Sequence, residues 1–208
     1  MDTRVLYLAS FLSCFGLTLL LTRLFRSLAI RFEIYDHTNS RKIHQTPKPY
    51  LGGLAVFLGF FVPLLYLSYS GAIFRIFIGS LLVTSLGLVD DLHGLSGFTK
   101  IIGLTMAVFL VAPAGLITNF FVGFEYSFLL NLGITTFWVI LLVSAINAID
   151  NMDGLATGLA LIAGLMFFVV GALQFPQPIW ALISIGFVGA LLGFLPFNFY
   201  PSTIFLGD

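Results

Sequence analysis

The chain has 208 residues, of which 59% are hydrophobic and only 9% are charged. Soluble domains carry roughly 25% charged residues, so this composition excludes an ordinary soluble protein and predicts an integral membrane protein. The formal net charge is zero, which says little about partners because the charges are segregated along the chain. The single cysteine, Cys14, cannot form an internal disulfide.

Uncharged stretches predict the membrane spans, because about 20 apolar residues suffice for one helical crossing. These stretches cover residues 5–22, 49–74, 101–124, 126–149 and 154–207. The last is long enough for two crossings, and residues 174–178 offer a polar, proline-broken turn between them. We therefore expect an all-α polytopic membrane bundle of about seven helices. The expected spans are 5–26, 51–70, 72–89, 101–118, 128–146, 155–173 and 179–197.

Basic residues predict the orientation. In this layout the odd-numbered helices all finish on one face, and seven of the nine basic residues fall there. They are Arg23, Arg26, Arg31, Arg41, Lys42, Lys48 and Lys100. By the positive-inside rule this face is cytoplasmic and the N-terminus is external, as in a multi-pass protein of the cell membrane. No soluble domain is evident, so residues 1–208 are expected to form one transmembrane domain.

The first cytoplasmic loop is rich in cationic side chains. Arg41, Lys42, His44 and Lys48 precede Gly52-Gly53. One interpretation is an orientation signal alone; the other is recognition of phosphate oxygens, because these groups are donors without acceptors when protonated.

Acidic residues stand at the ends of the apolar stretches. Asp90-Asp91 closes the third predicted helix, where two acids oppose the helix dipole. They represent either a solvated helix end or a pair that engages a metal and a proton separately. Asp208, the last residue, is either a frayed terminus or part of the same chemistry.

The third cytoplasmic loop carries an amide and two carboxylates. Asn147, Asp150 and Asp153 are spaced three apart and would share one face in helical geometry. The alternative is that they are ordinary turn and N-cap residues.

Taken in order, four segments resemble the polyprenyl-phosphate N-acetylhexosamine-1-phosphate transferases, which include the phospho-N-acetylmuramoyl-pentapeptide translocases. They are Arg41-Lys42-Ile43-His44 to Gly52-Gly53, Asp90-Asp91, Asn147 to Gly154, and Asn198-x-x-Pro201 to Asp208. The resemblance implies transfer of a sugar-1-phosphate from a UDP-linked amino sugar to polyprenyl phosphate, with release of UMP. It also implies Mg²⁺ as the cofactor, with Mn²⁺ as a substitute. The expected partners are the lipid carrier, the UDP-sugar and no nucleic acid, and a homodimer is left open.

The same resemblance assigns roles to individual residues. Asp208 matches the metal-binding acid, Asp90 the acid that deprotonates the lipid phosphate, and Asp91 its partner near the metal. The remaining matches are to substrate-binding positions. They are Arg41, Lys42 and His44, the nucleotide-sugar loop residues Asn147, Asp150 and Asp153, the polar residue Asn198, and Phe205 near the uracil.

Two departures and two rival functions accompany this interpretation. Asn151 stands where the family often has glycine, and the chain ends at Asp208 whereas family members continue through further helices. We therefore expect a C-terminally incomplete chain that inserts in the membrane but does not turn over alone.

The rivals are a transporter or channel with interfacial acids, and an inactive fragment that acts as a binding partner. Transport sites usually lie within spans near the midplane, whereas these acids gather at one interface. Among amino sugars, a plain N-acetylhexosamine is favoured over peptide-linked muramic acid.

Overall fold

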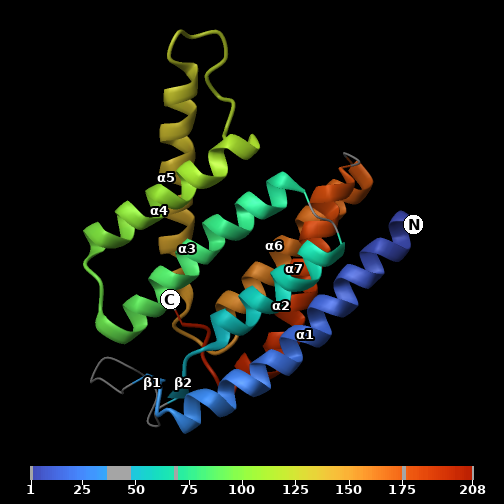
Figure 1. Ribbon diagram of the computed structural model, residues 1–208, viewed down its shortest axis with the longest axis vertical. Helices are drawn as coiled ribbons and strands as arrows, with labels where there is room; N and C mark the ends of the chain where they lie inside the picture. The colour runs from blue at the N-terminus through green and yellow to red at the C-terminus, as the bar shows by residue number, and fades with distance from the viewer. Residues whose placement is uncertain (1, 37–47, 68–69, 175–176, 208) are drawn as a thin grey trace. The chain divides into compact units, whose positions relative to one another are not determined.

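The computed structural model describes residues 2–36, 48–67, 70–174 and 177–207. Within these residues the secondary structure is almost entirely helical, which confirms the all-α prediction (Figure 1). The helices are α1 (Thr3–Arg31), α2 (Gly52–Leu67), α3 (Gly71–His93), α4 (Gly97–Val111), α5 (Ser127–Ile149), α6 (Leu155–Val169) and α7 (Pro178–Asn198). A 3-10 turn, η1 (Ala112–Ala114), follows α4, and a π-helical turn, η2 (Val170–Gln174), extends α6. Two short strands, β1 (Tyr35–Asp36) and β2 (Lys48–Pro49), pair antiparallel.

Helix lengths agree with a multi-pass membrane protein. Five helices are long and apolar enough to cross a membrane, namely α1, α3, α5, α6 with η2, and α7; α2 and α4 are shorter apolar helices. The predicted end of the fourth helix at residue 118 is wrong, because α4 ends at Val111. Pro113 lies in the following 3-10 turn, and Gly115 closes that turn with a φ of 78°. A proline lacks the N–H that would continue the α-helix.

The chain packs as two units, each described by itself. Unit 1 comprises Met1–Ser68 and Asp150–Asp208, and unit 2 comprises Tyr69–Ile149. Unit 1 therefore contains α1, α2, α6 and α7 with the two strands, while unit 2 contains α3, α4 and α5. The single-domain organisation of residues 1–208 stays a prediction.

Close packing of α1 on α7 organises unit 1. The buried face of α1 is a row of small residues spaced four apart, which runs Ser10, Cys14, Thr18 and Thr22. On α7, a Cβ at Gly189 would lie 2.4 Å from the backbone oxygen of Phe11, and one at Gly193 would lie 2.5 Å from that of Phe15. Small residues of this kind let helix backbones approach closely where no hydrophobic effect drives association.

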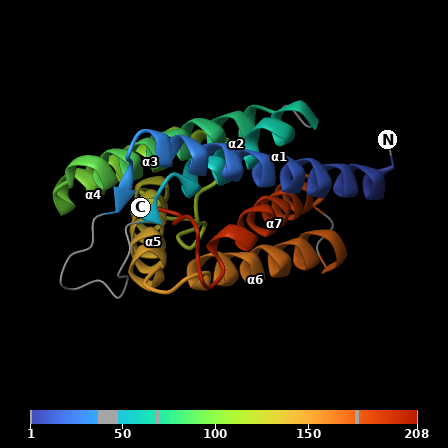
Figure 2. The ribbon, with the colours of Figure 1, turned by 90° about the horizontal axis from the view of Figure 1, so that it is seen from below.

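The other helices of unit 1 also pack on α7. Helix α2 lies beside α1 and α7 (Figure 1), and its residues Phe57, Phe60 and Leu64 are buried. From another side α6 lies along α7 (Figure 2), where Gly164 receives the side chains of Phe187 and Val188. As a result α7 is the most buried of the long apolar helices in the described chain.

In unit 2, α3 and α4 interlock through complementary glycines. A Cβ at Gly103 of α4 would lie 2.1 Å from Leu86 of α3, and a Cβ at Gly79 of α3 would lie 2.5 Å from Val111. Each helix thus receives a branched side chain of the other. A small core of Val108, Ala112 and Leu132 joins α4 and η1 to α5.

Candidate active site

The C-terminal segment of unit 1 docks on the start of α2 through its backbone. The N–H groups of Gly52 and Gly53 donate to the carbonyls of Phe205 and Leu206 over 3.1 and 2.7 Å, and the N–H of Phe205 donates to Pro49 over 2.8 Å. The first N–H groups of a helix have no partner within the helix, so this docking satisfies two of them. It joins the glycine pair of the first motif to the terminal motif.

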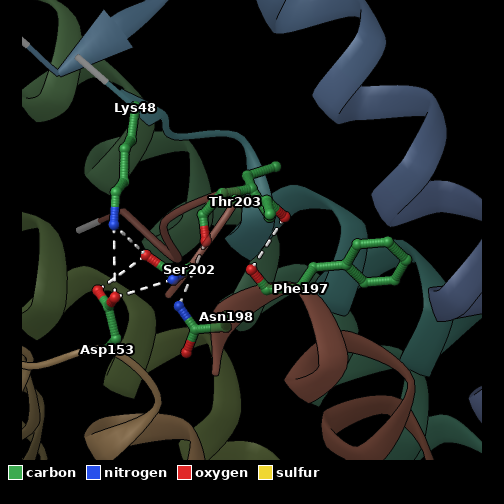
Figure 3. A network of polar contacts seen from close by, with 7 residues as sticks. Lys48, Asp153, Phe197, Asn198, Ser202 and Thr203 are labelled. Atoms are coloured by element: carbon green, nitrogen blue, oxygen red, sulfur yellow. Dashed lines mark hydrogen bonds and ion pairs between the residues drawn. The ribbon is translucent and has the colours of Figure 1, made fainter. Parts of the chain in front are cut away.

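A polar network beside this contact ties together three loops of unit 1 (Figure 3). The Asp153 carboxylate accepts from the Ser202 N–H over 2.9 Å and from the Ser202 hydroxyl over 2.8 Å. The Lys48 ammonium donates to Ser202 Oγ over 2.8 Å and lies 3.4 Å from Asp153 Oδ2. The side chains of Lys48 and Asp153 are only 15% and 5% exposed, so this charge pair is largely shielded from solvent.

The Asp153 carboxyl is ionised at neutral pH. Burial raises its pKa, but the N–H and hydroxyl of Ser202 and the Lys48 ammonium together outweigh burial and hold the pKa below the ordinary value of 3.8. Hydrogen bonds and a nearby cation both favour the charged form of a carboxyl group. Lys48 and Asp153 therefore form a charge-balanced pair.

Asn198 is buried at the end of α7 and joins two further parts of unit 1. Its Oδ1 accepts from the hydroxyl of Thr157 on α6 over 2.7 Å, and its amide nitrogen donates to the carbonyl of Ile204 over 3.3 Å. The residue is 2% exposed. The oxygen and the nitrogen of the Asn198 side-chain amide are therefore both hydrogen-bonded to other protein groups. These bonds connect the C-terminal segment to α6 and α7.

The basic end of α1 also reaches the C-terminal segment. Arg26 Nε donates to the carbonyl of Thr203 over 3.3 Å, and the N–H of Thr203 donates to the carbonyl of Phe197 over 2.7 Å. Arg23 lies over the Phe197 ring at 5.9 Å from its centroid. The segment after α7 is therefore hydrogen-bonded to α1, α2 and α7.

In unit 2, Asp90 and Asp91 occupy the last turn of α3, as predicted from the sequence. Asp90 Oδ1 accepts from the N–H of Leu95 over 2.6 Å, and Oδ2 pairs with the Lys100 ammonium in the first turn of α4. The side chain of Asp90 is 10% exposed. A cation at this position offsets the unfavourable interaction between an acid and a helix C-terminus. Sequence reasoning did not assign Lys100 to the site.

The predicted shared face of Asn147, Asp150 and Asp153 is wrong. α5 ends at Ile149, and Asp150 and Asp153 lie in the turn before α6, which begins after Gly154. Gly154 has a φ of 75°, a left-handed conformation, and is the N-cap residue of α6. Asn147 is exposed on the last turn of α5, in unit 2, whereas both acids belong to unit 1.

Several predicted site residues lie outside the described part of the chain: Arg41, Lys42, His44 and Asp208. Their roles stay predictions, as does the meeting of the acids of both units on one face.

The predicted list of site residues did not include three described residues that take part in the network of unit 1, namely Lys48, Ser202 and Thr157. The sequence left Lys48 as either an orientation signal or a donor to phosphate oxygens, whereas in the structure its ammonium lies on Asp153 and Ser202. No local pattern signals these contacts, because they join residues far apart in sequence.

Comparison with known proteins shows which sequences this chain is similar to. The sequence pattern of glycosyl transferase family 4 matches residues 73–208. The chain is 34% identical to the decaprenyl-phosphate N-acetylglucosaminephosphotransferase of Mycobacterium leprae, over 92% of the chain and 54% of the relative. It is 33% identical to the probable undecaprenyl-phosphate N-acetylglucosaminyl 1-phosphate transferase of Bacillus subtilis, over 91% and 55%. It is 29% identical to the phospho-N-acetylmuramoyl-pentapeptide-transferase of Desulforudis audaxviator, over 81% and 60%.

The alignments cover most of this chain but only part of each relative. The chain spans about half the length of the curated N-acetylglucosamine-1-phosphate transferases that it matches. The family pattern covers well over half of the chain itself and includes Asp90-Asp91, the Asp153 loop and the C-terminal segment. The chain therefore belongs to glycosyl transferase family 4.

Proposed function

We propose that the protein containing this chain transfers N-acetylglucosamine-1-phosphate from a UDP-sugar to a membrane polyprenyl phosphate and releases UMP. The names of the relatives from Mycobacterium leprae and Bacillus subtilis support the lipid carrier and the sugar. The chain is 29% identical to the Desulforudis audaxviator pentapeptide transferase over 81% of its length, against 34% and 33% over 92% and 91% for the two N-acetylglucosamine relatives, and on this ground we favour a plain N-acetylhexosamine as the substrate. This is a first membrane step of cell-envelope polysaccharide synthesis.

One structural observation carries the proposal: residues 48–53, 153–154 and 198–207 converge within unit 1. These segments belong to three of the four motifs on which the resemblance rests. They are brought together by specific hydrogen bonds and are not merely successive turns of one helix. A transporter site would instead place ionisable groups within the spans, whereas Asp90 and Asp153 lie at helix ends.

The proposed reaction is an exchange of one phosphoanhydride for another. A phosphate oxygen of the lipid attacks the sugar-bearing phosphorus of the UDP-sugar, the bond to the bridging oxygen breaks, and UMP leaves with that oxygen. Asp90 would accept the proton of the lipid phosphate. Its ion pair with Lys100 and the hydrogen bond from Leu95 hold one carboxylate orientation for that step.

The donor chemistry fits a magnesium ion shared with substrate. Mg²⁺ is usually held by one or two carboxylates together with substrate phosphates, and Asp91 and Asp208 would supply those carboxylates. Among the described residues, which do not include Asp208, no group of three or more candidate ligands occurs. When bound, Mg²⁺ or Mn²⁺ would offset negative charge on the reacting phosphate oxygens.

The orientation follows from the charges. We place the N-terminus outside and the reacting face on the cytoplasmic side of the inner or plasma membrane, because Arg23, Arg26, Arg31 and Lys100 fall on that face. The UDP-sugar would then meet the lipid carrier at the inner leaflet. A homodimer stays a prediction.

UMP release tests the proposal. The chain, and beside it the product of the longest reading frame that contains it, are purified and supplied with Mg²⁺, undecaprenyl phosphate and UDP-N-acetylglucosamine. We expect UMP release that requires the lipid phosphate, and little release with UDP-N-acetylmuramoyl-pentapeptide. Absence of lipid-dependent release from both proteins would refute the function, and faster release with the pentapeptide substrate would refute the sugar.

A further inference from the structure

In unit 2, the loop between α4 and α5 continues an apolar stretch past the end of a helix (Figure 1). Residues 101–124 are uncharged, but α4 ends at Val111. From Lys100 to Ala114 the helix and the 3-10 turn rise by about 23 Å, at roughly 1.5 and 2.0 Å per residue, whereas the hydrocarbon core of a bilayer is about 30 Å thick. A helix that starts at the interface with Lys100 thus ends inside the core, and the α4–α5 loop, defined as residues 115–126, begins there.

The α4–α5 loop exposes large apolar side chains. Phe120, Val122 and Phe124 are 69%, 76% and 62% exposed. Between residues 101 and 149 the sequence has a single charge, Glu125, and Tyr126 follows it. Tyrosine is enriched where a membrane meets water. The end of the loop is therefore suited to the headgroup layer, and the apolar residues before it are suited to the acyl chains.

Two buried side chains of α5 hold the backbone of the loop. The amide of Asn131, which is 4% exposed, accepts from the Phe121 N–H over 3.0 Å and donates to the Phe121 carbonyl over 3.1 Å. One turn further along α5, the Thr135 hydroxyl accepts from the Thr118 N–H over 3.0 Å. The loop therefore runs beside the first turns of α5.

These contacts give the depth of the loop. Asn131 and Thr135 follow Ser127, the first residue of α5, by about one and two turns. At a rise of roughly 1.5 Å per residue, they lie at most about 6 and 12 Å deeper along the membrane normal. Apolar groups of interfacial segments enter a membrane by about 5–10 Å. With Glu125 at the headgroups, residues 118–121 thus reach the upper acyl chains.

A loop at this depth needs partners for its backbone. Irregular backbone at membrane depth is tolerated where protein groups satisfy its N–H and carbonyl groups. Asn131 does this for both polar groups of Phe121, and the same pairing offsets the cost of a buried amide in an apolar helix. In a loop surrounded by water neither group would need a protein partner, because water would take that place.

We propose that the α4–α5 loop is a lipid-binding element that lies in the interfacial layer of the bilayer, with Phe120 and Val122 among the upper acyl chains and Glu125 at the headgroups. The exposed amide of Asn119 then lies toward the headgroups, and Asn131 holds the loop at this depth. The leaflet concerned is the external one in the proposed orientation. The inference rests on the geometry of unit 2 and stands whether or not the protein transfers a sugar phosphate.

Fluorescence quenching by brominated lipids measures this contact. The two native tryptophans, Trp138 and Trp180, are replaced by phenylalanine, and Phe120→Trp places a single reporter on the loop. The chain is reconstituted in phosphatidylcholine nanodiscs whose acyl chains carry bromine either near the headgroup or near the methyl end, and acrylamide is the quencher in water. Trp138 alone, 45% exposed on α5, is the reference for lipid contact. His93→Trp, at the exposed end of α3, is the reference for water.

We expect bromine near the headgroup to quench Phe120→Trp at least about two-thirds as strongly as it quenches Trp138, since an aromatic side chain at the interface contacts the upper acyl chains. Bromine near the methyl end should quench it less. Acrylamide should quench it at most about half as strongly as it quenches His93→Trp. The same result is expected in the product of the longest reading frame that contains the chain, with any further tryptophans replaced by phenylalanine.

Two outcomes would overturn the proposal. Strong quenching by acrylamide with weak quenching by bromine would place the loop in water. Weak quenching by both would show that protein covers the loop, either a second copy of the chain or a segment outside it.

Asn131→Leu, added to Phe120→Trp, tests how the loop is held. We expect bromine quenching to fall about twofold or more, because Phe121 loses the partner of both its backbone groups and the loop moves toward water. Thr136→Val is the matched control. The Thr136 hydroxyl donates to the Leu132 carbonyl within α5, so its loss should leave the quenching unchanged.

Unchanged quenching in Asn131→Leu would overturn the holding role of Asn131. An equal loss of quenching for Trp138 in the same variant would show that Asn131 serves the fold of unit 2 as a whole, which also overturns that role. In either case the Phe120→Trp measurement decides by itself whether the loop lies among lipids.

Discussion

Gly52→Ala is the substitution that tests most directly how the C-terminal segment is held. A Cβ at this position would lie 2.4 Å from the carbonyl oxygen of Phe205 and 2.6 Å from the ring of Phe194. Neither neighbour moves easily, because the first is a backbone atom within a hydrogen-bonded pair and Phe194 is fully buried. The segment must therefore retreat from α2.

The cost follows from that retreat. Ordinary contact begins at 3.4 Å, so the Phe205 carbonyl must move by about 1 Å, which would carry the 3.1 Å hydrogen bond from the Gly52 N–H beyond its range. Overpacking of a well-packed site costs about 1–3 kcal/mol, and the hydrogen bond contributes about 1 kcal/mol more. We expect a total loss of roughly 2–4 kcal/mol, or about 4–16 °C in Tm for a chain of this size.

The chain carries its own reporter for this measurement. Cys14 is the only cysteine, and it is fully buried on α1, within the same unit as Gly52. A dye that fluoresces on reaction with thiols therefore reports the exposure of Cys14 as purified protein is heated in detergent. Gly158→Ala is the matched control, since nothing lies within 4 Å of the added Cβ inside α6 and alanine favours a helix by about 1 kcal/mol.

A Tm for Gly52→Ala equal to that of the parent would refute the reasoning, because the added methyl would then have found room that the structure does not contain. A fall of similar size in Gly158→Ala would also refute it, since the effect would then follow from any added methyl group in unit 1.

Three further predictions concern catalysis, orientation and pH. Asp90→Asn should lower UMP release by about 100-fold or more while KM for the UDP-sugar stays near the parent value, as expected for loss of a proton acceptor; near-normal turnover would remove Asp90 from that role. In a Cys14→Ser background, cysteines at Ser40 and Ser96 should resist an impermeant thiol reagent outside cells while one at Ser127 reacts, and the reverse pattern would overturn the orientation. Because the folded-state pKa of Asp153 is depressed, its stabilisation is complete above the ordinary carboxyl pKa and is lost as the pH falls through the folded value. The difference in Tm between the parent and Asp153→Asn should therefore be constant from about pH 8 to pH 5 and shrink below about pH 4; a difference that disappears near neutral pH would contradict this assignment.

Sequence patterns predicted the helices well because their signals are local. Long uncharged stretches, interrupted by charges or prolines, define where helices occur, and α7 begins within one residue of its predicted start. The error at α4 arose because the apolar stretch continues to Phe124 although Pro113 ends the helix. Hydropathy alone does not distinguish an apolar loop from an apolar helix.

The site was predictable in its residue types but not in its contacts. Acids next to glycines and at helix ends indicated chemistry, and spacing alone suggested one helical face for residues 147–153. The structure has no such face, because α5 ends at Ile149 and residues 150–153 form a turn before α6. The pairing of Lys48 with Asp153 and of Asp153 with Ser202 spans 105 and 49 positions. Such contacts depend on tertiary packing, which no local pattern encodes.

The discontinuity of unit 1 has a consequence for biogenesis. Unit 2 is one continuous stretch, Tyr69–Ile149, and can assemble as soon as α5 has been inserted. Unit 1 must wait, because α1 and α2 are synthesised before unit 2 whereas α6 and α7 are synthesised after it. Until α7 and the segment after it have been synthesised, the Ser10 hydroxyl lacks its acceptor, the Leu182 carbonyl, and the first N–H groups of α2 lack the carbonyls of Phe205 and Leu206. If translation stops before α7, helices α1 and α2 are left in the membrane with these polar groups unpaired. Membrane quality control can then recognise the incomplete unit by those groups.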